Sequence, residues 1–520
     1  MKHINDLNPQ PPFLLRPSTW LVIFLIASIS AACYYFLWRP HLKKSQPTII
    51  QTTFDFVHNI SKTQMQPGRA LNIQHWQTTQ GTQVYFVASP ELPIVDIRFI
   101  FSAGAARDGQ IPGIAKLTNA MIGEGTSTHT SDEIVAAFEQ LGAQVQTDAD
   151  RDMAVLELRS LTHPEYLQPT LALVSEIISQ PTFPATAFQR NLNLMRLNLE
   201  GEKQDPDALA ERALFAHLYP NHPYQTMPDG TVDSLKTITI KDLQTFYQRY
   251  YVGKNCTLVI VGALNRAQAE AMAQQLTAQL PVGEAPTELP KALALTAPIQ
   301  QHISFPSTQT HIQLATSGIT YNDADYFPLL VGNYILGGGS FSSILNKTIR
   351  QDRGLSYSVY SGLNPMQGGG PFIIGLQTKN ESAAEALQLT KTTLAHFIAQ
   401  GPTAEQLKQA KEYLLASFPM KAASNGSILD YLGLIGFYHL PIQYLETYRE
   451  KISQVTMEQI KQAFETHIRL NQAAIITVGP NDIAAPQNTA HTIPVTLNHA
   501  AQSISLLPAH ATQKKLSAHQ

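Results

Sequence analysis

A run of three glycines is the first feature of this 520-residue sequence that could do chemistry. Gly337, Gly338 and Gly339 precede Ser340, and backbone N–H groups in such a run can cradle a phosphate. A P-loop also requires a preceding strand and a Gly-Lys-Ser or Gly-Lys-Thr step, which the segment lacks. The run therefore does not predict nucleotide binding, and a flexible turn between two helices is the alternative to any binding role.

Histidine and cysteine are too sparse or too poorly spaced to predict a metal site. The two cysteines, Cys33 and Cys256, cannot build a disulfide framework or a thiolate cage. His217 and His222 are separated by Pro220, so they cannot share one helix face as ligands. The C-terminal segment carries four more histidines, but its mixed Ala, Pro, Gln and Thr composition favours a disordered end over a metal site.

The charge balance disfavours nucleic acid as a partner. The net charge is −3, charged residues make up 14% of the chain, and no stripe of Lys and Arg with interleaved aromatics is present. A chain of 520 residues is also too long for one hydrophobic core, so two or more domains are expected.

Residues 20–38 form a charge-free run, WLVIFLIASISAACYYFLW. This length allows a helix to span a bilayer, and it exceeds the apolar core of a cleaved signal peptide. We predict an N-terminal segment at 1–19, a transmembrane helix at 20–38 and a polar stalk at 39–70. Cleavage near Cys33 is the less favoured alternative. The Lys and Arg count on the two sides differs by one, which weakly favours a cytoplasmic bulk.

After the stalk, strand and helix patterns alternate. The segment 94–101, IVDIRFIF, alternates apolar with charged residues and predicts a strand. The segment 113–121, GIAKLTNAM, places Ile114, Leu117 and Met121 along one stripe at helical spacing. We expect a helix here that is kept for its packing stripe.

An internal repeat organises the chain beyond these elements. Residues 235–262 and 452–479 align without gaps at an offset of 217. Each unit reads as a Thr-capped amphipathic helix, a turn and a buried strand ending in Gly. The segments MIGEGTS, 121–127, and ILGGGSF, 335–341, repeat more loosely.

The repeat predicts an α+β fold made of two homologous tandem domains. We place the first domain at 71–280, a proline-rich linker at 281–301, the second domain at 302–480 and a flexible tail at 481–520. We expect the linker to act as a hinge between the two halves. Two unrelated α/β domains that share a common unit are the alternative.

Four segments resemble the pitrilysin/insulinase-like metallopeptidases, in particular their two-domain bacterial and processing-peptidase branch. The segments are GIAKLTNAMIGEGT (113–126), HPYQTMPDG (222–230), ILGGGSFSSIL (335–345) and IRQDRGLSYSV (349–359). The resemblance covers about 71–480 and implies two pitrilysin-like α/β-roll domains.

The same resemblance implies that the zinc site has been lost. In active members, the histidines of an H-x-x-E-H helix bind zinc and the glutamate activates water. These positions fall on Lys116, Asn119 and Ala120, and the family's third ligand, eight residues before Pro206, falls on Asn198. The sequence is therefore similar to a degenerate member, and we expect no metal cofactor in this chain.

The resemblance also implies a substrate-binding pair in the second half. Active relatives use an Arg and a Tyr seven residues later, which here are Arg350 and Tyr357, with Arg353 as the second choice for the Arg. Both can donate hydrogen bonds to a peptide carbonyl or an oxyanion. Gly337, Gly338 and Gly339 match a segment that contacts substrate in non-catalytic processing-peptidase subunits. A solvated charge and an ordinary strand tyrosine are the alternatives.

Together these features predict a non-catalytic, substrate-binding subunit of a two-chain zinc peptidase. Its partner would carry H-x-x-E-H and the zinc, and the pair would cleave peptides or unfolded proteins. A membrane-anchored peptide-binding or structural scaffold without a peptidase partner is the alternative. The resemblance favours a bacterial inner-membrane location with the bulk of the chain in the periplasm, against the weak charge count.

Overall fold

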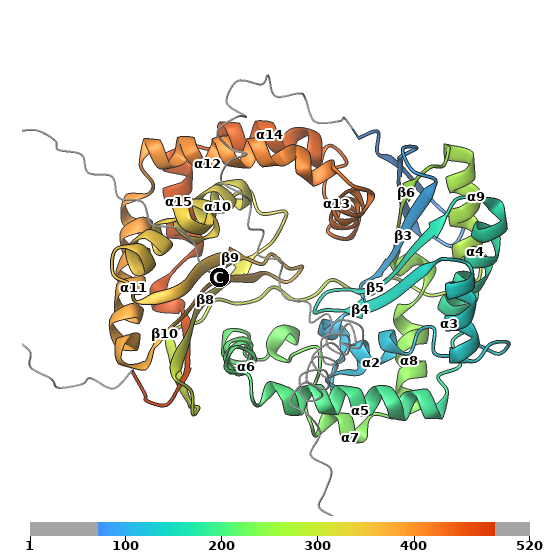
Figure 1. The fold of residues 1–520 in the computed structure, drawn as a ribbon, viewed down its shortest axis with the longest axis horizontal. Coiled ribbons are helices and arrows are strands. Elements are labelled where there is room, and N and C mark those ends of the chain that lie inside the picture. Colours follow the sequence, from blue (N-terminus) through green and yellow to red (C-terminus); the bar gives the residue numbers. More distant parts are fainter. Residues whose placement is uncertain (1–70, 484–520) are drawn as a thin grey trace, which may run out of the picture. The chain divides into compact units, whose positions relative to one another are not determined.

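The computed structural model describes residues 71–483, which all belong to one compact unit (Figure 1). The predicted N-terminal segment, membrane helix and stalk, and the predicted tail from residue 484, lie outside the described residues. Between residues 71 and 483, no helix is long and apolar enough to cross a membrane.

The first half contains a six-stranded sheet in the order β1-β2-β6-β3-β5-β4. Neighbouring strands are antiparallel except β2 and β6, which are parallel. The buried, β-branched sequence CTLVIVG suits β6 to its central position. The strands are β1 (Gln74–Gln77), β2 (Gln83–Ala88), β3 (Ile94–Phe101), β4 (Gln144–Ala149), β5 (Ala154–Leu161) and β6 (Cys256–Gly262).

The helices of the first half follow the sequence signals closely. The helical region after β5 divides where Pro184 and Asp205 start new helices as N-caps. The helices are α2 (Ile114–Ala120), α3 (Ser131–Gln140), α4 (Pro164–Ser179), α5 (Ala185–Glu202), α6 (Pro206–Leu218), α7 (Ser234–Thr237), α8 (Ile240–Tyr250) and α9 (Arg266–Thr277).

The second half contains a five-stranded sheet in the order β7-β11-β8-β10-β9. Its strands are β7 (Ile299–Ser304), β8 (Gln309–Ile319), β9 (Ser356–Leu363), β10 (Gly370–Lys379) and β11 (Ala474–Gly479). Its helices are α10 (Tyr326–Asn333), α11 (Ala383–Gln400), α12 (Ala404–Ser417), α13 (Asn425–Phe437), α14 (Tyr444–Gln454) and α15 (Met457–His467), with π-helical turns η6 (Tyr334–Gly338) and η8 (Asn346–Gln351).

The structure confirms the internal repeat. Helices α8 and α15 are eleven residues each and begin at equivalent positions. Thr239 caps α8 and Thr456 caps α15, and each forms a capping box with the third helical residue. Strands β6 and β11 then lie inside their respective sheets. The two-domain α+β architecture expected from the sequence is therefore present.

One helix from each half packs on the sheet of the other half. Helix α6 packs on β8 and β11 of the second sheet, and α13 packs on β3 and β6 of the first sheet (Figure 1). A buried apolar cluster joins Phe215 of α6 to Ile476 of β11, and another joins Leu432 of α13 to Val259 of β6. Each sheet is therefore covered on one face by its own helices and on the other by a helix from the opposite half.

Polar side-chain contacts accompany both exchanged helices. Asp430 of α13 accepts a hydrogen bond from Arg98 of β3 at 2.6 Å. Asp207 of α6 lies 2.6 Å from His311 of β8. Separating the halves would break both contacts and expose both apolar faces. The exchange therefore opposes the hinge motion that we expected from the linker.

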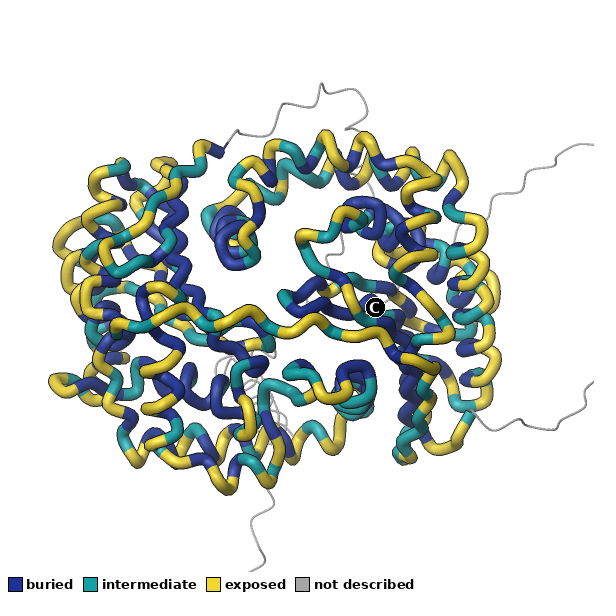
Figure 2. The backbone as a smooth tube through the Cα atoms, turned by 180° about the vertical axis from the view of Figure 1, so that it is seen from behind, coloured by how far each residue is buried: buried dark blue, intermediate teal, exposed yellow. Residues whose placement is uncertain are grey.

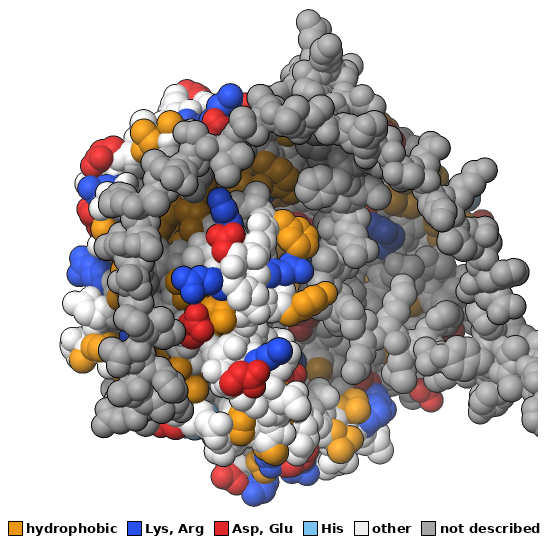
Figure 3. All heavy atoms as spheres, turned by 60° about the vertical axis from the view of Figure 1, so that its left-hand side comes forward, with side chains coloured by type: hydrophobic (Ala, Val, Ile, Leu, Met, Phe, Trp, Pro, Cys, Tyr) orange, Lys and Arg blue, Asp and Glu red, His pale blue; other side chains and the backbone are white. Residues whose placement is uncertain are grey.

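The linker is an exposed extended segment that connects the two halves (Figure 2). Val282 is 99% exposed and Leu293 is 82% exposed. Strand β7 begins at Ile299, so the last three residues of the predicted linker belong to the second sheet. On the face shown in Figure 3, outside the grey atoms, basic and acidic side chains are interspersed without a patch of one sign.

Candidate functional site

Helix α2 occupies the position of the zinc-binding helix in the resembled family. Gly113, with φ 95°, precedes the helix, and Asp108 accepts hydrogen bonds from the backbone N–H groups of Gly113 and Ala115 at 2.7 and 2.9 Å. Ile114, Leu117 and Met121 are 4%, 0% and 0% exposed, which confirms the predicted packing stripe.

Lys116 forms an ion pair with Asp229. Its Nζ lies 2.8 Å from Asp229 Oδ1 in the turn that ends the segment 222–230. Gly230 of the same turn approaches so closely that a Cβ there would lie 2.4 Å from Pro112 O. The segment 222–230 therefore packs against the start of α2 and supplies the partner of Lys116.

Asn119 faces the protein interior and is 1% exposed. Its Nδ2 donates to Val155 O of β5 and to Tyr251 Oη, both at 3.1 Å. An amide in this role satisfies a buried carbonyl, which an ionised glutamate could not do. The position of the catalytic glutamate thus has a structural role here.

The remaining two positions also lack ligand chemistry. Ala120 offers no ligand atom, and Asn198 is exposed on α5 without a hydrogen bond or ion pair to α2 among residues 71–483. An ammonium, two amides and a methyl group do not fit the nitrogen and carboxylate donors that zinc requires. The residues at α2 therefore do not fit the zinc site of active relatives.

In the part of the chain that the structure describes, one group of three acidic and histidine side chains is close enough to hold a metal ion. It comprises Asp323, Asp325 and His467, in the second half. His467 Nε2 lies 3.0 Å from Asp325 Oδ2, and Asp323 Oδ1 accepts from the backbone N–H of Asp325 at 2.9 Å. These contacts connect the start of α10 to the end of α15, so the three side chains have a structural role.

The structure brings Arg350 and Tyr357 together. Arg350 Cζ lies 5.1 Å from the centroid of the Tyr357 ring, a cation–π distance. Phe341 provides a second ring, with its centroid 4.8 Å from the same atom. Tyr357 is 81% exposed and Phe341 is 57% exposed, so both rings face solvent.

Arg350 and Arg353 differ in their partners. Arg353 Nη1 lies 3.5 Å from Glu385 Oε1. Arg350 makes no ion pair with any described carboxylate. Its guanidinium therefore keeps its donors available, whereas Arg353 already has an acidic neighbour. This difference favours Arg350 as the residue that would meet a ligand.

The three glycines occupy distinct environments. Gly337 is buried, and a Cβ there would lie 2.4 Å from Ser361 Oγ of β9. Gly338 is exposed, and Gly339 ends η6 with φ −83°. Close approach of β9 explains Gly337, while a substrate contact at Gly338 and Gly339 stays a prediction.

Sequence reasoning missed the partners that complete these positions. Phe341 lies two positions after the glycine run, and this closeness in sequence was the one available signal for it. Asp229 and Tyr251 lie more than a hundred residues from the side chains they contact, so no local pattern indicated them.

Two tandem α+β halves, a helix at the zinc-helix position and an Arg/Tyr pair beside an edge strand define the fold class of the two-domain metallopeptidases. Residues 83–227 match the family model described as Insulinase (Peptidase family M16). Residues 237–414 match the model described as Peptidase M16 inactive domain. The chain belongs to peptidase family M16.

Individual relatives cover most of the described region. A crystal structure of a peptidase M16 inactive domain from Pseudomonas fluorescens is 41% identical, with a TM-score of 0.77, over 79% of this chain and 99% of that chain. The Non-peptidase homolog YmxG of Helicobacter pylori is 25% identical over 74% of this chain and 89% of its own length. The mitochondrial-processing peptidase subunit beta of Blastocladiella emersonii is 21% identical over 80% and 90%, respectively.

Proposed function

We propose that this chain is the non-catalytic, substrate-binding subunit of a two-chain M16-type zinc peptidase. The partner would carry H-x-x-E-H and the zinc ion, and this chain would contribute Arg350 and Tyr357 to the partner's site. The observation that carries the proposal is the contrast between the two halves. In helix α2, Lys116 and Asn119 stand at zinc-site positions but make structural contacts. Arg350, in contrast, has no carboxylate partner among the described residues.

The chemistry of the pair suits a peptide undergoing cleavage. A guanidinium and a phenol can donate to the carbonyl oxygen as negative charge develops on it. The rings of Phe341 and Tyr357 both lie within cation–π distance of the guanidinium and restrict its position. This restriction reduces the side-chain entropy that would be lost when a ligand binds.

Four strands, β1, β4, β7 and β9, form the edges of the two sheets in residues 71–483, and an extended peptide could add to such an edge. β9, which carries Tyr357, pairs only with β10, and β4 pairs only with β5. An added strand would use main-chain hydrogen bonds, which gives affinity with little dependence on sequence. Peptides or unfolded proteins are therefore the substrate class that we propose.

The proposal includes a bacterial inner-membrane location, with residues 20–38 as the anchor and the bulk of the chain in the periplasm. The name of the Helicobacter relative, a non-peptidase homolog, supports a chain that does not cleave alone.

A mild-detergent pull-down of the full chain from its native membranes tests the pairing. The expected result is a stoichiometric second chain that carries H-x-x-E-H and a preparation that cleaves an unfolded protein in a chelator-sensitive manner. Recovery of only unrelated envelope proteins would favour the scaffold alternative. Tightly bound zinc and chelator-sensitive cleavage by this chain alone would contradict a non-catalytic role.

A further inference from the structure

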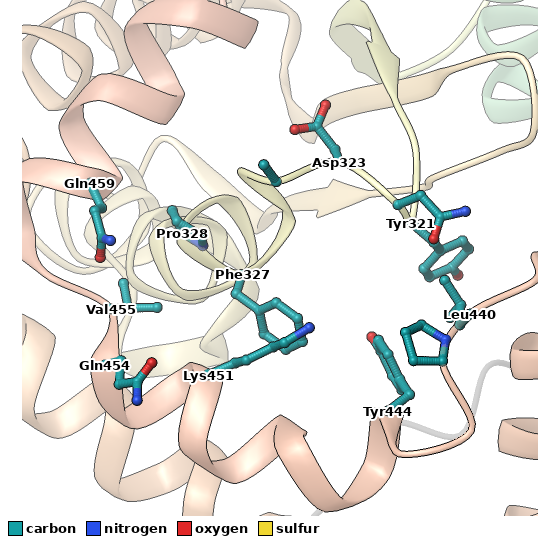
Figure 4. Close-up of a pocket in the computed structure, with 13 residues that line it drawn as sticks. Tyr321, Asp323, Phe327, Pro328, Leu440, Tyr444, Lys451, Gln454, Val455 and Gln459 are labelled. Atoms are coloured by element: carbon teal, nitrogen blue, oxygen red, sulfur yellow. The ribbon is translucent and has the colours of Figure 1, made fainter.

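A cavity of about 420 Å³ lies in the second half, away from the residues of α2 and η8. It is bordered by the entry to α10, by α14, by the start of α15 and by residues 440–441 (Figure 4). This volume is within the range of small-molecule sites, roughly 300–1,000 Å³. No part of the proposed peptidase function uses it.

Lys451 gives the cavity a positive charge. Among the described residues it forms no ion pair, and its Nζ lies 5.1 Å from the centroid of the Phe327 ring. Figure 4 shows the polar ends of Lys451 and Tyr444 directed toward the same open space. A cation without a counter-ion beside an open cavity favours an anionic ligand.

The acidic group in the wall does not cancel this charge. Asp323 Oδ1 accepts from the N–H of Asp325 at 2.9 Å and lies 3.7 Å from His467 Nε2. The Asp323 carboxylate therefore already has the Asp325 N–H and the His467 ring of α15 as neighbours. In Figure 4 it lies across the cavity from Lys451.

Gln459 places an amide on the side of the cavity away from the Lys451 ammonium (Figure 4). Its Oε1 accepts from the backbone N–H of Thr456 at 2.9 Å in the capping box of α15. Because one end of the amide is used in this way, the NH₂ group is the end left for the cavity. In Figure 4 the Lys451 ammonium points away from Gln459 and toward Tyr444, so a carboxylate would contact the ammonium and not this amide.

The remaining wall is aromatic. Phe327 and Tyr444 have ring centroids 6.0 Å apart, and Tyr321 closes the side next to residues 440–441. His439, just before that wall, has φ 52°, a conformation that non-glycine residues adopt rarely. This conformation sets the direction in which the chain enters the wall at residues 440–441.

We propose that this cavity binds a small carboxylate that carries one flat apolar group. The carboxylate would lie against the ammonium of Lys451, and the ring against Phe327 and Tyr444. Such a ligand could be a free aromatic acid or the C-terminal residue of a peptide, which share this chemistry. The inference does not depend on Arg350 or on a peptidase partner.

Isothermal titration of the purified full chain tests the site with three probes. N-acetyl-L-phenylalanine and 3-phenylpropanoate should bind, and N-acetyl-L-phenylalanine amide, which lacks the charge, should bind at least about fivefold more weakly. Tighter binding of N-acetyl-L-phenylalanine would indicate a peptide C-terminus, and equal binding of the two acids would indicate a free aromatic acid. Absence of binding by both acids at millimolar concentration overturns the proposal.

Variants localise the binding. Lys451→Met should weaken both acids about tenfold, and the matched control Lys408→Met, an exposed lysine on α12, should not. Ala324→Trp should block binding sterically, because Ala324 is exposed and lines the cavity, so the fold is spared. Affinities that are unchanged by both Lys451→Met and Ala324→Trp contradict the assignment.

Discussion

Tyr438 donates a hydrogen bond to Asp152 Oδ2 at 3.1 Å, joining residues 286 positions apart. Asp152 is 2% exposed and also accepts from Tyr224 Oη at 2.5 Å and from the N–H of Gln367 at 2.8 Å. Burial raises the pKa of Asp152, while these donors oppose the rise. One buried carboxyl group of the first half is thus held by two residues of the second half.

Removing either tyrosine hydroxyl should destabilise the protein, by unequal amounts. Tyr224→Phe leaves two buried groups short of a partner, because Tyr224 Oη also accepts from Gly368 N at 2.8 Å. We expect a loss of about 2–4 kcal/mol for Tyr224→Phe and about 1–2 kcal/mol for Tyr438→Phe. Urea unfolding midpoints measure both. Tyr413→Phe, at an exposed position, is the control, and shifts no larger than the control would show that Asp152 does not join the halves.

The exchange of α13 can be tested with two glycines of the same helix. A Cβ on Gly436 would lie 2.6 Å from Thr257 Cγ2 and 2.7 Å from Tyr85 Cε2, both in the first sheet. On Gly426 it would meet only Ser424 Oγ at 3.9 Å. Gly436→Ala should therefore destabilise by about 1–3 kcal/mol. Gly426→Ala should stabilise by about 0.5–1 kcal/mol, since alanine favours the helix.

Thermal unfolding of Gly436→Ala and Gly426→Ala, measured under the same conditions, tests these two changes in stability. Opposite signs support the contact between α13 and the first sheet. Equal effects at the two positions would mean that α13 does not pack on that sheet as described.

The pH dependence of stability should include a contribution from Asp108, whose pKa burial raises to about 7 despite the hydrogen bonds from Gly113 and Ala115. In the unfolded chain this carboxyl group titrates near pH 4. Between about pH 4 and 7 the folded chain keeps the proton that the unfolded chain releases. The free energy of unfolding should therefore fall as the pH rises through this window.

Asp108→Asn removes this titration. From about pH 5 to about pH 7, the wild type should lose about 1–3 kcal/mol relative to Asp108→Asn. Urea unfolding at both pH values measures the difference, with the exposed Glu381→Gln as the control. If the wild type instead gains stability relative to Asp108→Asn over this pH range, the predicted direction of the pH dependence is wrong.

Local patterns were sufficient to predict the elements and the repeat. The strand at 94–101 has the bounds predicted from its alternating residues. Thr239 and Thr456 signalled their helices because capping boxes depend on residues three positions apart. Short-range spacing controls such features, and spacing is visible in a sequence.

Long-range contacts were not predictable in the same way. Helical periodicity shows that α6 and α13 have buried faces but not which sheet covers them. The site shows the same division. The spacing and resemblance singled out Arg350 and Tyr357, which do lie together, but the ring of Phe341 and the Glu385 partner of Arg353 emerged only from the fold.

The central claim is that this chain supplies Arg350 to a zinc site held by a partner. The most direct measurement compares kcat for unfolded-protein cleavage by the co-purified assembly carrying Arg350→Ala or Arg353→Ala in this chain. We expect a loss of about 10²-fold for Arg350→Ala with the assembly intact, and wild-type turnover for Arg353→Ala. Wild-type turnover by an intact Arg350→Ala assembly would contradict it.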